Sequence, residues 1–237
     1  MKGIDENGRT ATSPVDVPTA SAELDCISIA RQATAVLLPH HRHDLSHGSG
    51  LTNSTIAQAE LYSEQDPVKL QTLLRWNGPA TSLGAALVFP FRRSTGEFSG
   101  FARARPDHPR LVDGKPVKYE QPSGEPNRAY FPVEAVAAIQ TRHGMLGLVE
   151  GEKKALAACQ AGLPCIGICG VWNWQKGRSG EQKETDAPRQ LIDDLAAIDW
   201  QDREVWIGFD RDPRRNPSVN HAAAELARVL SLLGARV

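Results

Sequence analysis

Cysteine, long apolar runs and an excess of either charge are all scarce in this sequence. The four cysteines (Cys26, Cys159, Cys165 and Cys169) form no CxxC pair and no disulfide-rich spacing, which argues against a disulfide scaffold. No apolar run approaches the roughly 18 residues of a membrane-spanning helix, and the N-terminus lacks the charged and then apolar pattern of a signal peptide. We therefore expect a cytoplasmic protein with reduced, mostly buried thiols and no membrane partner.

Two further absences limit the function. The formal net charge of −1 gives no global electrostatic case for nucleic-acid binding, although it leaves room for a local basic face. The GxxxxGK[ST] loop is missing, so the chain is not itself a helicase motor. With 237 residues, of which 41% are hydrophobic, the chain can form one large domain or two small ones.

The chain divides into four segments that differ in composition and periodicity. Residues 1–24 are polar and rich in Pro, Thr and Ser, which predicts a disordered tail. Residues 25–83 look mainly helical. Residues 84–145 open with an apolar stretch, a turn and the run GFARARP, and predict a small, mostly β subdomain with basic residues. Residues 146–237 form the last segment.

This last segment alternates between strands and helices. LGLVE, PCIGICG and EVWIGFD predict three strands, and EKKALAACQA predicts a helix after the first of them. Such an order predicts an α/β fold in which a parallel sheet has helices on both faces. The closing ARV resembles the start of a fourth strand, so we expect the chain to end before the fold is complete, as a fragment of a longer protein or a split gene product.

Two more helices are expected in this segment. The run PRQLIDDLAAIDW predicts an amphipathic helix over residues 188–200, with Leu191, Leu195 and Ile198 on one face. Asn216 and Pro217 predict the start of another helix that ends at Gly234. Its apolar positions recur at helical spacing and are Val219, Leu226, Val229 and Leu233.

Acidic residues end two of the predicted strands. LGLVE finishes in Glu150, and EVWIGFDRD finishes in Asp210 and Asp212. Ligands of open parallel sheets gather at the carboxyl ends of the strands, so these acids can converge although about 60 residues separate them. Clustered carboxylates repel one another, and Mg²⁺ would remove that penalty while bridging to phosphate. The alternative is that Glu150 only begins a helix and the two aspartates only open a polar loop.

The motifs resemble a known group of proteins. LVEG, followed by FDRD, is similar to the Toprim domain of bacterial primases, topoisomerases and some nucleases. Upstream, VFPF, GFARARP, VKYEQPSG and RAYFP resemble, in that order, the core of bacterial DnaG-type primase, which implies a small α+β subdomain before the Toprim-like sheet. HDLSHGSGL, VKYEQP, EGEKKALAA, GVWNW and FDRDPRRNPSV resemble an uncharacterised family found in plasmid- and phage-borne replication proteins, often joined to helicase modules.

The resemblance implies roles for individual residues. It makes Glu150, Asp210 and Asp212 the catalytic acids that bind Mg²⁺ or Mn²⁺. The cations that it directs to nucleic acid or phosphate are Arg103, Arg105 and Lys118, with Lys153 and Lys154 as further phosphate ligands. The sequence departs from the primases in the residues after EG, where Lys154 and Ala155 are closer to a topoisomerase motif. It also lacks an N-terminal zinc ribbon, since the first 140 residues hold one cysteine.

Three functions are compatible with these residues. The first is a primase-like enzyme of mobile-element replication that transfers nucleotides from nucleoside triphosphates along single-stranded DNA, with Mg²⁺ on the acidic residues. The second is a Toprim nuclease that cleaves DNA. The third is a non-catalytic module that binds nucleic acid or loads a partner helicase, which would be missing from this chain.

Other features have a structural and a functional interpretation. Residues 92–128 hold eight Arg and Lys against five Asp and Glu, and the alternation of Arg103 and Arg105 puts both on one face of a strand. His40, His41, His43 and His47 form a cluster in which His43 and His47 would share a helix face. Zinc is conceivable there, but a helix end and a loop surface are favoured. Trp172 and Trp174 are expected to pack in the core rather than stack on a base.

Overall fold

The computed structural model describes residues 36–142, 144–177, 189–210 and 217–237. The tail expected over residues 1–24 lies outside these ranges. Nine strands are assigned within them: β1 (Tyr62–Glu64), β2 (Ala86–Arg92), β3 (Phe98–Pro106), β4 (Leu111–Val112), β5 (Lys115–Pro116), β6 (Ala129–Tyr130), β7 (Leu146–Glu150), β8 (Cys165–Ile168) and β9 (Val205–Gly208). The helices of at least five residues within these ranges are α2 (Pro39–His43), the π-helix η1 (Asp44–Gly48), α3 (Asn53–Gln58), α4 (Pro67–Leu74), α5 (Val133–Thr141), α6 (Glu152–Gln160) and α8 (Pro217–Leu232).

The first sheet is antiparallel and has the order β1-β2-β3. Strands β2 and β3 are the predicted strand, turn and strand, and Phe89 lies opposite Arg103 in their register. β2 is apolar along almost its whole length and buried, because it is the central strand and both of its faces are covered. Strand β1 lies inside the segment that was expected to be mainly helical, between the helices α3 and α4.

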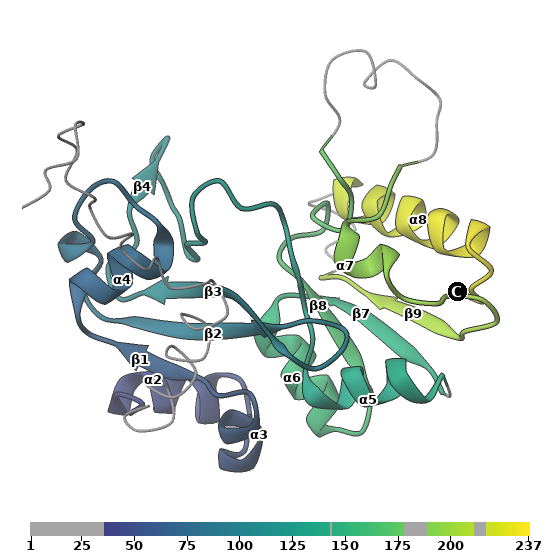
Figure 1. The fold of residues 1–237 in the computed structure, drawn as a ribbon, viewed down its shortest axis with the longest axis horizontal. Coiled ribbons are helices and arrows are strands. Elements are labelled where there is room, and N and C mark those ends of the chain that lie inside the picture. Colours follow the sequence, from purple (N-terminus) through teal and green to yellow (C-terminus); the bar gives the residue numbers. More distant parts are fainter. Residues whose placement is uncertain (1–35, 143, 178–188, 211–216) are drawn as a thin grey trace, which may run out of the picture. The chain divides into compact units, whose positions relative to one another are not determined.

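The second sheet has four strands in the order β6-β8-β7-β9. β7 pairs in parallel with both β8 and β9, as predicted, and β6 adds an antiparallel edge. In Figure 1, α5 and α6 lie on one side of this sheet, and α8 lies on the other with the short helix α7 (Asp193–Ala196). Since both faces are covered, the first four residues of β7 are buried. The expected α/β class with a parallel sheet is confirmed.

Two local predictions need correction. RAYFP was expected in the β subdomain, but Ala129 and Tyr130 form β6 and pair with β8. The helix expected over residues 188–200 shrinks to α7, because Ile192 donates its N–H to the Trp174 carbonyl at 2.9 Å, and Lys176 donates to the Gln190 carbonyl at 2.9 Å. That pairing holds residues 190–192 extended.

The two helices predicted near the C-terminus, over residues 188–200 and from Asn216 to Gly234, differ in how their apolar residues are placed. Leu191, Leu195 and Ile198 are all buried although most of their helix is missing. In α8, three of the four predicted apolar residues are buried, but Leu233 is exposed beyond the helix end. After Gly234, Arg236 makes a parallel bridge to Glu204, which is how a strand starting at ARV would begin.

One apolar cluster runs through both sheets. The Phe91 ring of β2 packs edge-on against the Tyr130 ring of β6, with the ring centroids 5.0 Å apart. Trp174 is fully buried, as expected, whereas Trp172 is only partly buried. None of the helices in the described ranges is both long and apolar enough to cross a membrane.

Candidate functional site

The carboxyl ends of β7 and β9 carry the predicted acids. Val149 and Gly208 are partners in the parallel register, so Glu150 and Asp210 follow at the same edge of the sheet. Glu150 is half-buried and Asp210 is exposed. Asp212 lies outside the described residues.

A glycine turns the chain from β7 into α6. Gly151 has φ +89°, a left-handed conformation in which a Cβ would be strained, and its N–H donates to the Ile168 carbonyl at 2.8 Å. Gly167 on β8 lets the helix approach: a Cβ there would lie 3.0 Å from the Gly151 carbonyl oxygen and 3.3 Å from the Ala155 Cβ. The first turn of α6 is therefore held against the edge of the sheet.

Each of the three charged residues in this first turn binds a residue of opposite charge from elsewhere in the chain. Glu152 accepts from the Arg103 guanidinium of β3 at 2.6 Å. The Lys153 ammonium donates to Asp44 at 2.9 Å, and that of Lys154 pairs with Asp210. We call these three ion pairs the α6 junction, because they join the start of α6 to β3, to the segment after α2 and to the end of β9.

The Arg103–Glu152 pair is the most buried part of the junction. The side chain of Glu152 is 2% exposed and that of Arg103 is 12% exposed. Burial opposes the charge of Arg103, but the adjacent Glu152 carboxylate raises the pKa of that guanidinium above its ordinary value. The Arg103 guanidinium lies over the Tyr119 ring at 4.8 Å, and burial raises the pKa of Tyr119 to about 12.

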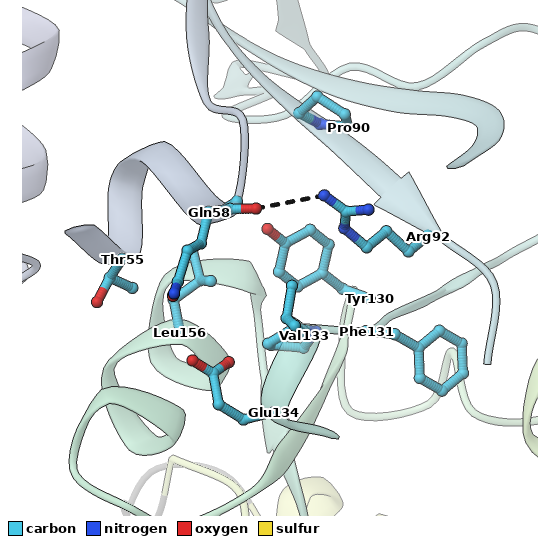
Figure 2. Close-up of a pocket in the computed structure, with 11 residues that line it drawn as sticks. Thr55, Gln58, Pro90, Arg92, Tyr130, Phe131, Val133, Glu134 and Leu156 are labelled. Atoms are coloured by element: carbon cyan, nitrogen blue, oxygen red, sulfur yellow. Dashed lines mark hydrogen bonds between the residues drawn. The ribbon is translucent and has the colours of Figure 1, made fainter. Parts of the chain in front are cut away.

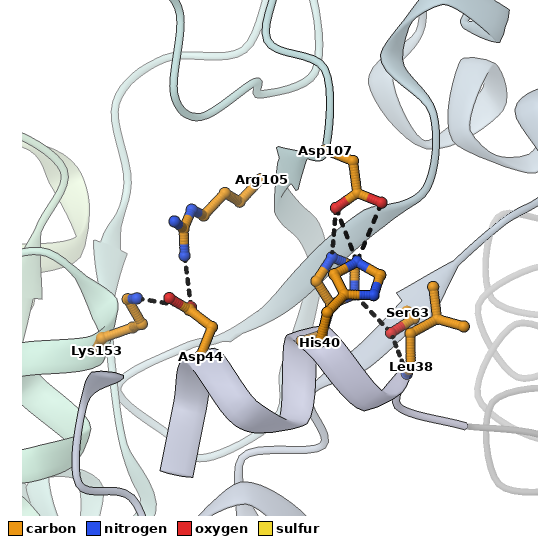
Figure 3. A network of polar contacts seen from close by, with 8 residues as sticks. Leu38, His40, Asp44, Ser63, Arg105, Asp107 and Lys153 are labelled. Carbon is orange, nitrogen blue, oxygen red and sulfur yellow. Dashed lines mark hydrogen bonds and ion pairs between the residues drawn. The ribbon is translucent and has the colours of Figure 1, made fainter. Parts of the chain in front are cut away.

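Asp44 connects two cations, as Figure 3 shows. It accepts from Arg105 at 2.5 Å and from Lys153 at 2.9 Å. Burial alone would raise the pKa of Asp44, but the hydrogen bond and charge of Lys153, together with Arg105, lower it below 3.8. Both cations keep partly exposed side chains, so they can reach solvent-borne anions at the surface.

The predicted basic residues thus have different surroundings. The two arginines of β3 share a face, as the alternation indicated, and both meet carboxylates. Lys118 is exposed beside Tyr119, whose ring faces Arg103. Sequence reasoning missed Asp44 and Glu152 as partners in the junction, although both lie in the motifs HDLSHGSGL and EGEKKALAA that carried the resemblance.

The acidic residues at this edge have the donor chemistry that a divalent cation requires. Glu150 and Asp210 offer hard carboxylate oxygens, which suit Mg²⁺. The Lys154 ammonium already neutralises Asp210, and because both side chains are well exposed, that lysine can move aside. Among the described residues, Glu150 and Asp210 belong to no group of three metal-ligand side chains; the group found there is formed by His40, His41 and Asp107.

Two concave regions differ in what they could hold. The pocket in Figure 2, next to Arg92 and Tyr130, has a volume of about 10 Å³, which is room for a single water molecule. A second, open cleft of about 480 Å³ is polar and falls in the size range of small-ligand sites. Arg128 lies in its wall, and the carbonyl of this arginine accepts from Cys169 just beyond β8, so the cleft borders the same edge of the sheet as Glu150.

The fold is a mixed α/β fold similar to that of the catalytic domains of DnaG-type primases. The zinc-binding and RNA polymerase domains of Aquifex aeolicus primase superpose with a TM-score of 0.57 at 15% identity, covering 90% of this chain and 52% of that one. The RNA polymerase domain of Mycobacterium tuberculosis primase DnaG gives a TM-score of 0.53 at 16% identity, covering 88% and 71%. The chain therefore spans about half the length of the Aquifex aeolicus fragment.

Comparison by sequence adds a family of unassigned role. The family model for a domain of unknown function, DUF3854, matches residues 138–237, which include β7, α6 and β9. No curated protein matches the sequence.

Proposed function

We propose that this chain is the Toprim-type catalytic part of a primase-like protein of mobile-element DNA replication. It would join nucleotides on a single-stranded DNA template, by attack of a 3′-hydroxyl on the α-phosphorus of a nucleoside triphosphate with loss of pyrophosphate. The observation that supports this most is the placement of Glu150 and Asp210 at the ends of neighbouring parallel strands, on a fold similar to that of primase cores.

The acids would hold the metal. Glu150 and Asp210, joined by Asp212, would bind Mg²⁺ or Mn²⁺, which when bound neutralises charge on the triphosphate. Lys154 would leave Asp210 at that point and contact a phosphate instead, since its side chain is flexible and exposed.

The cations of the junction would position nucleic acid. Arg105 and Lys153 meet at Asp44 with partly exposed side chains, and together they would bind template or triphosphate oxygens. Arg103 is too enclosed for a free phosphate contact, so its part in this proposal is to hold Tyr119 and Glu152 in place. Lys118 would add a phosphate contact from the exposed side of Tyr119.

The test is primer synthesis on single-stranded DNA with labelled nucleotides, a separately labelled template end and a magnesium titration. The variants are Glu150→Gln and Asp210→Asn, and the matched control is Glu204→Gln. Glu204 is an exposed acid at the opposite end of β9, so its loss leaves the carboxyl edge unchanged. We expect the first two variants to lose product by about 100-fold or more, as when a transition-state charge loses its electrostatic partner. Melting temperatures of the variants equal to that of the wild type would show that their fold is intact.

The outcomes separate the candidate activities. Product that disappears in both variants and persists in the control supports the proposal. Shortening of the template without nucleotide addition would replace it with Toprim nuclease chemistry at the same acids. Synthesis that continues in Asp210→Asn would refute the assignment of the site.

One observation favours a non-catalytic function instead. Arg103, Arg105, Lys153 and Lys154 are all paired with carboxylates of the chain itself, which leaves less free positive charge for nucleic acid. A module that binds single strands weakly and delivers a partner helicase would fit this neutralisation. Salt-dependent binding of a fluorescent single strand, with neither synthesis nor cleavage at any magnesium concentration, would favour that function.

A further inference from the structure

Three side chains of metal-ligand type converge where α2 meets the end of β3. His40 and His41 belong to α2, and Asp107 follows β3 directly. The Nε2 atom of each histidine lies 3.0 Å from Oδ1 of Asp107, and that of His40 is also 3.1 Å from Oδ2. Figure 3 shows the imidazole ring of His40 facing this carboxylate.

The second ring nitrogen of His41 is also held. Nδ1 of His41 lies 2.7 Å from the hydroxyl oxygen of Ser63 on β1, and that oxygen accepts the Leu38 N–H at 2.8 Å. Metal-binding histidines commonly have their other nitrogen hydrogen-bonded in this way, because the contact orients the ring. The orientation of His41 is therefore set by two elements besides its own.

The group is anchored on one side and open on the other. The side chain of His41 is 7% exposed, whereas those of Asp107 and His40 are 27% and 56% exposed. One donor atom from each of the three residues lies within 4.8 Å of the others. Metal–ligand bonds of about 2.0–2.2 Å in a tetrahedral arrangement place donor atoms roughly 3.3–3.5 Å apart, so small side-chain movements suffice.

We propose that His40, His41 and Asp107 form a binding site for a divalent transition-metal ion of the Zn²⁺ type, with a fourth position open to water. Two imidazole nitrogens and one carboxylate are a donor set that zinc accepts readily and Mg²⁺ does not. The site shares no residue with the acids at the ends of β7 and β9. It also differs from the pair His43 and His47, whose rings stack at 4.3 Å and which have no place in the three-residue group.

The ion would fasten α2 to the end of β3. The chain runs from α2 straight into Asp44, which binds Arg105 and Lys153 in the α6 junction. Arg105 and Asp107 are two residues apart on the same stretch of chain. A metal here would thus hold both ends of the Asp44–Arg105 contact in place, which is a structural rather than a chemical role.

The experiment uses the full chain, stripped with a chelator that is then removed, and titrated with Co²⁺ alone. Four-coordinate Co²⁺ gives intense visible absorption, and Zn²⁺ should displace it while a large excess of Mg²⁺ should not. The ligand variants are His40→Ala and Asp107→Asn, and Ser63→Ala tests the outer contact. The double variant His43→Ala/His47→Ala is the matched control, because it removes two histidines of the same segment.

We expect one four-coordinate Co²⁺ per chain, counted by its intense visible absorption, in the wild type and in the control; an ion on the carboxylates of Glu150 and Asp210 would be octahedral and would not give this signal. Affinity should fall by about 10- to 100-fold in Ser63→Ala, the usual effect of losing an outer contact, and by more than about 100-fold in the two ligand variants. Zn²⁺ should raise the melting temperature of the wild type and of the control but not of Asp107→Asn. Circular dichroism of the metal-free variants shows whether they fold. If His40→Ala does not fold, Asp107→Asn decides the question, because asparagine keeps the shape of the aspartate side chain.

Three results would overturn the site. Without stoichiometric binding to the wild type, the three residues are only a hydrogen-bonded link between α2 and β3. Equal loss of binding in the control would assign the ion to surface histidines, and undiminished affinity in Asp107→Asn would remove the carboxylate from the ligands. None of these results bears on nucleotide transfer, which is tested at other residues.

Discussion

Replacing Arg103 with methionine leaves the carboxylate of Glu152 without its partner. That carboxylate is 2% exposed and accepts from Arg103 at 2.6 Å, with the Cys169 thiol as a weaker donor at 3.7 Å. Removing one member of a buried ion pair typically costs about 3–5 kcal/mol, because the remaining charge is desolvated and uncompensated. We expect the free energy of unfolding of Arg103→Met to fall by that amount.

The double variant Arg103→Met/Glu152→Met separates the charge effect from the loss of packing. With both charges gone, the site becomes apolar at similar volume, and such replacements are often neutral or stabilising. The double variant should therefore recover most of the stability that Arg103→Met loses. Arg105→Met is the control, because the side chains of Arg105 and Asp44 are 38% and 31% exposed, and a pair of that kind contributes below about 1 kcal/mol.

Urea unfolding followed by tryptophan fluorescence measures these differences, since the chain has five tryptophans and some are buried. The reasoning is refuted if Arg103→Met is no less stable than Arg105→Met. It is also refuted if the double variant is as unstable as Arg103→Met, because packing and not charge would then explain the loss.

Three further predictions follow from the surroundings of single residues. The pKa of Asp44 is lower in the folded protein than its ordinary value of 3.8, so the Asp44 carboxylate stabilises the fold above pH 3.8 and this contribution is lost as the pH falls further. The wild type should therefore be more stable to urea than Asp44→Asn at pH 7, and this difference in unfolding free energy should vanish toward pH 3. Burial raises the pKa of the Cys159 thiol to about 11 and those of the Cys165 and Cys169 thiols to about 12. In the variant Cys26→Ser, the folded protein should therefore take up almost no iodoacetamide at pH 8, whereas the urea-unfolded protein should take up three equivalents. Fast labelling of the folded protein would contradict this. Gly151→Ala should lower the free energy of unfolding by about 1–2 kcal/mol because φ is +89°, and a thermal melt equal to wild type would show that this turn relaxes without cost.

The sequence alone determined the elements whose signal is local. Apolar runs bounded by glycine and charged residues predicted β7, β8 and β9, and helical spacing predicted α6 and α8, because these patterns follow from the backbone geometry of each element. The order of strands and helices was enough for the parallel sheet. It also predicted that Glu150 and Asp210 lie at one edge, since parallel strands end on the same side.

Only the tertiary structure decided which charges meet. Lys153 and Asp44 are 109 residues apart, and no spacing rule relates them; they pair because the segment after α2 lies beside the first turn of α6. Likewise, the sequence could not reveal that Glu152 is buried, because an acid in the first turn of a helix is ordinarily solvated. The histidine cluster shows the same limit: its partner Asp107 is 66 residues away from His41, and a local pattern favoured His43 and His47 instead.

The shortened α7 has the same physical cause. Its apolar spacing indicated a helix over residues 188–200, and those apolar residues are indeed buried, but the backbone of residues 190–192 forms hydrogen bonds with the stretch at Trp174. The polarity of a side chain predicts whether it is buried. The choice between a helical and an extended backbone instead depends on which other strand or loop offers hydrogen-bond partners nearby.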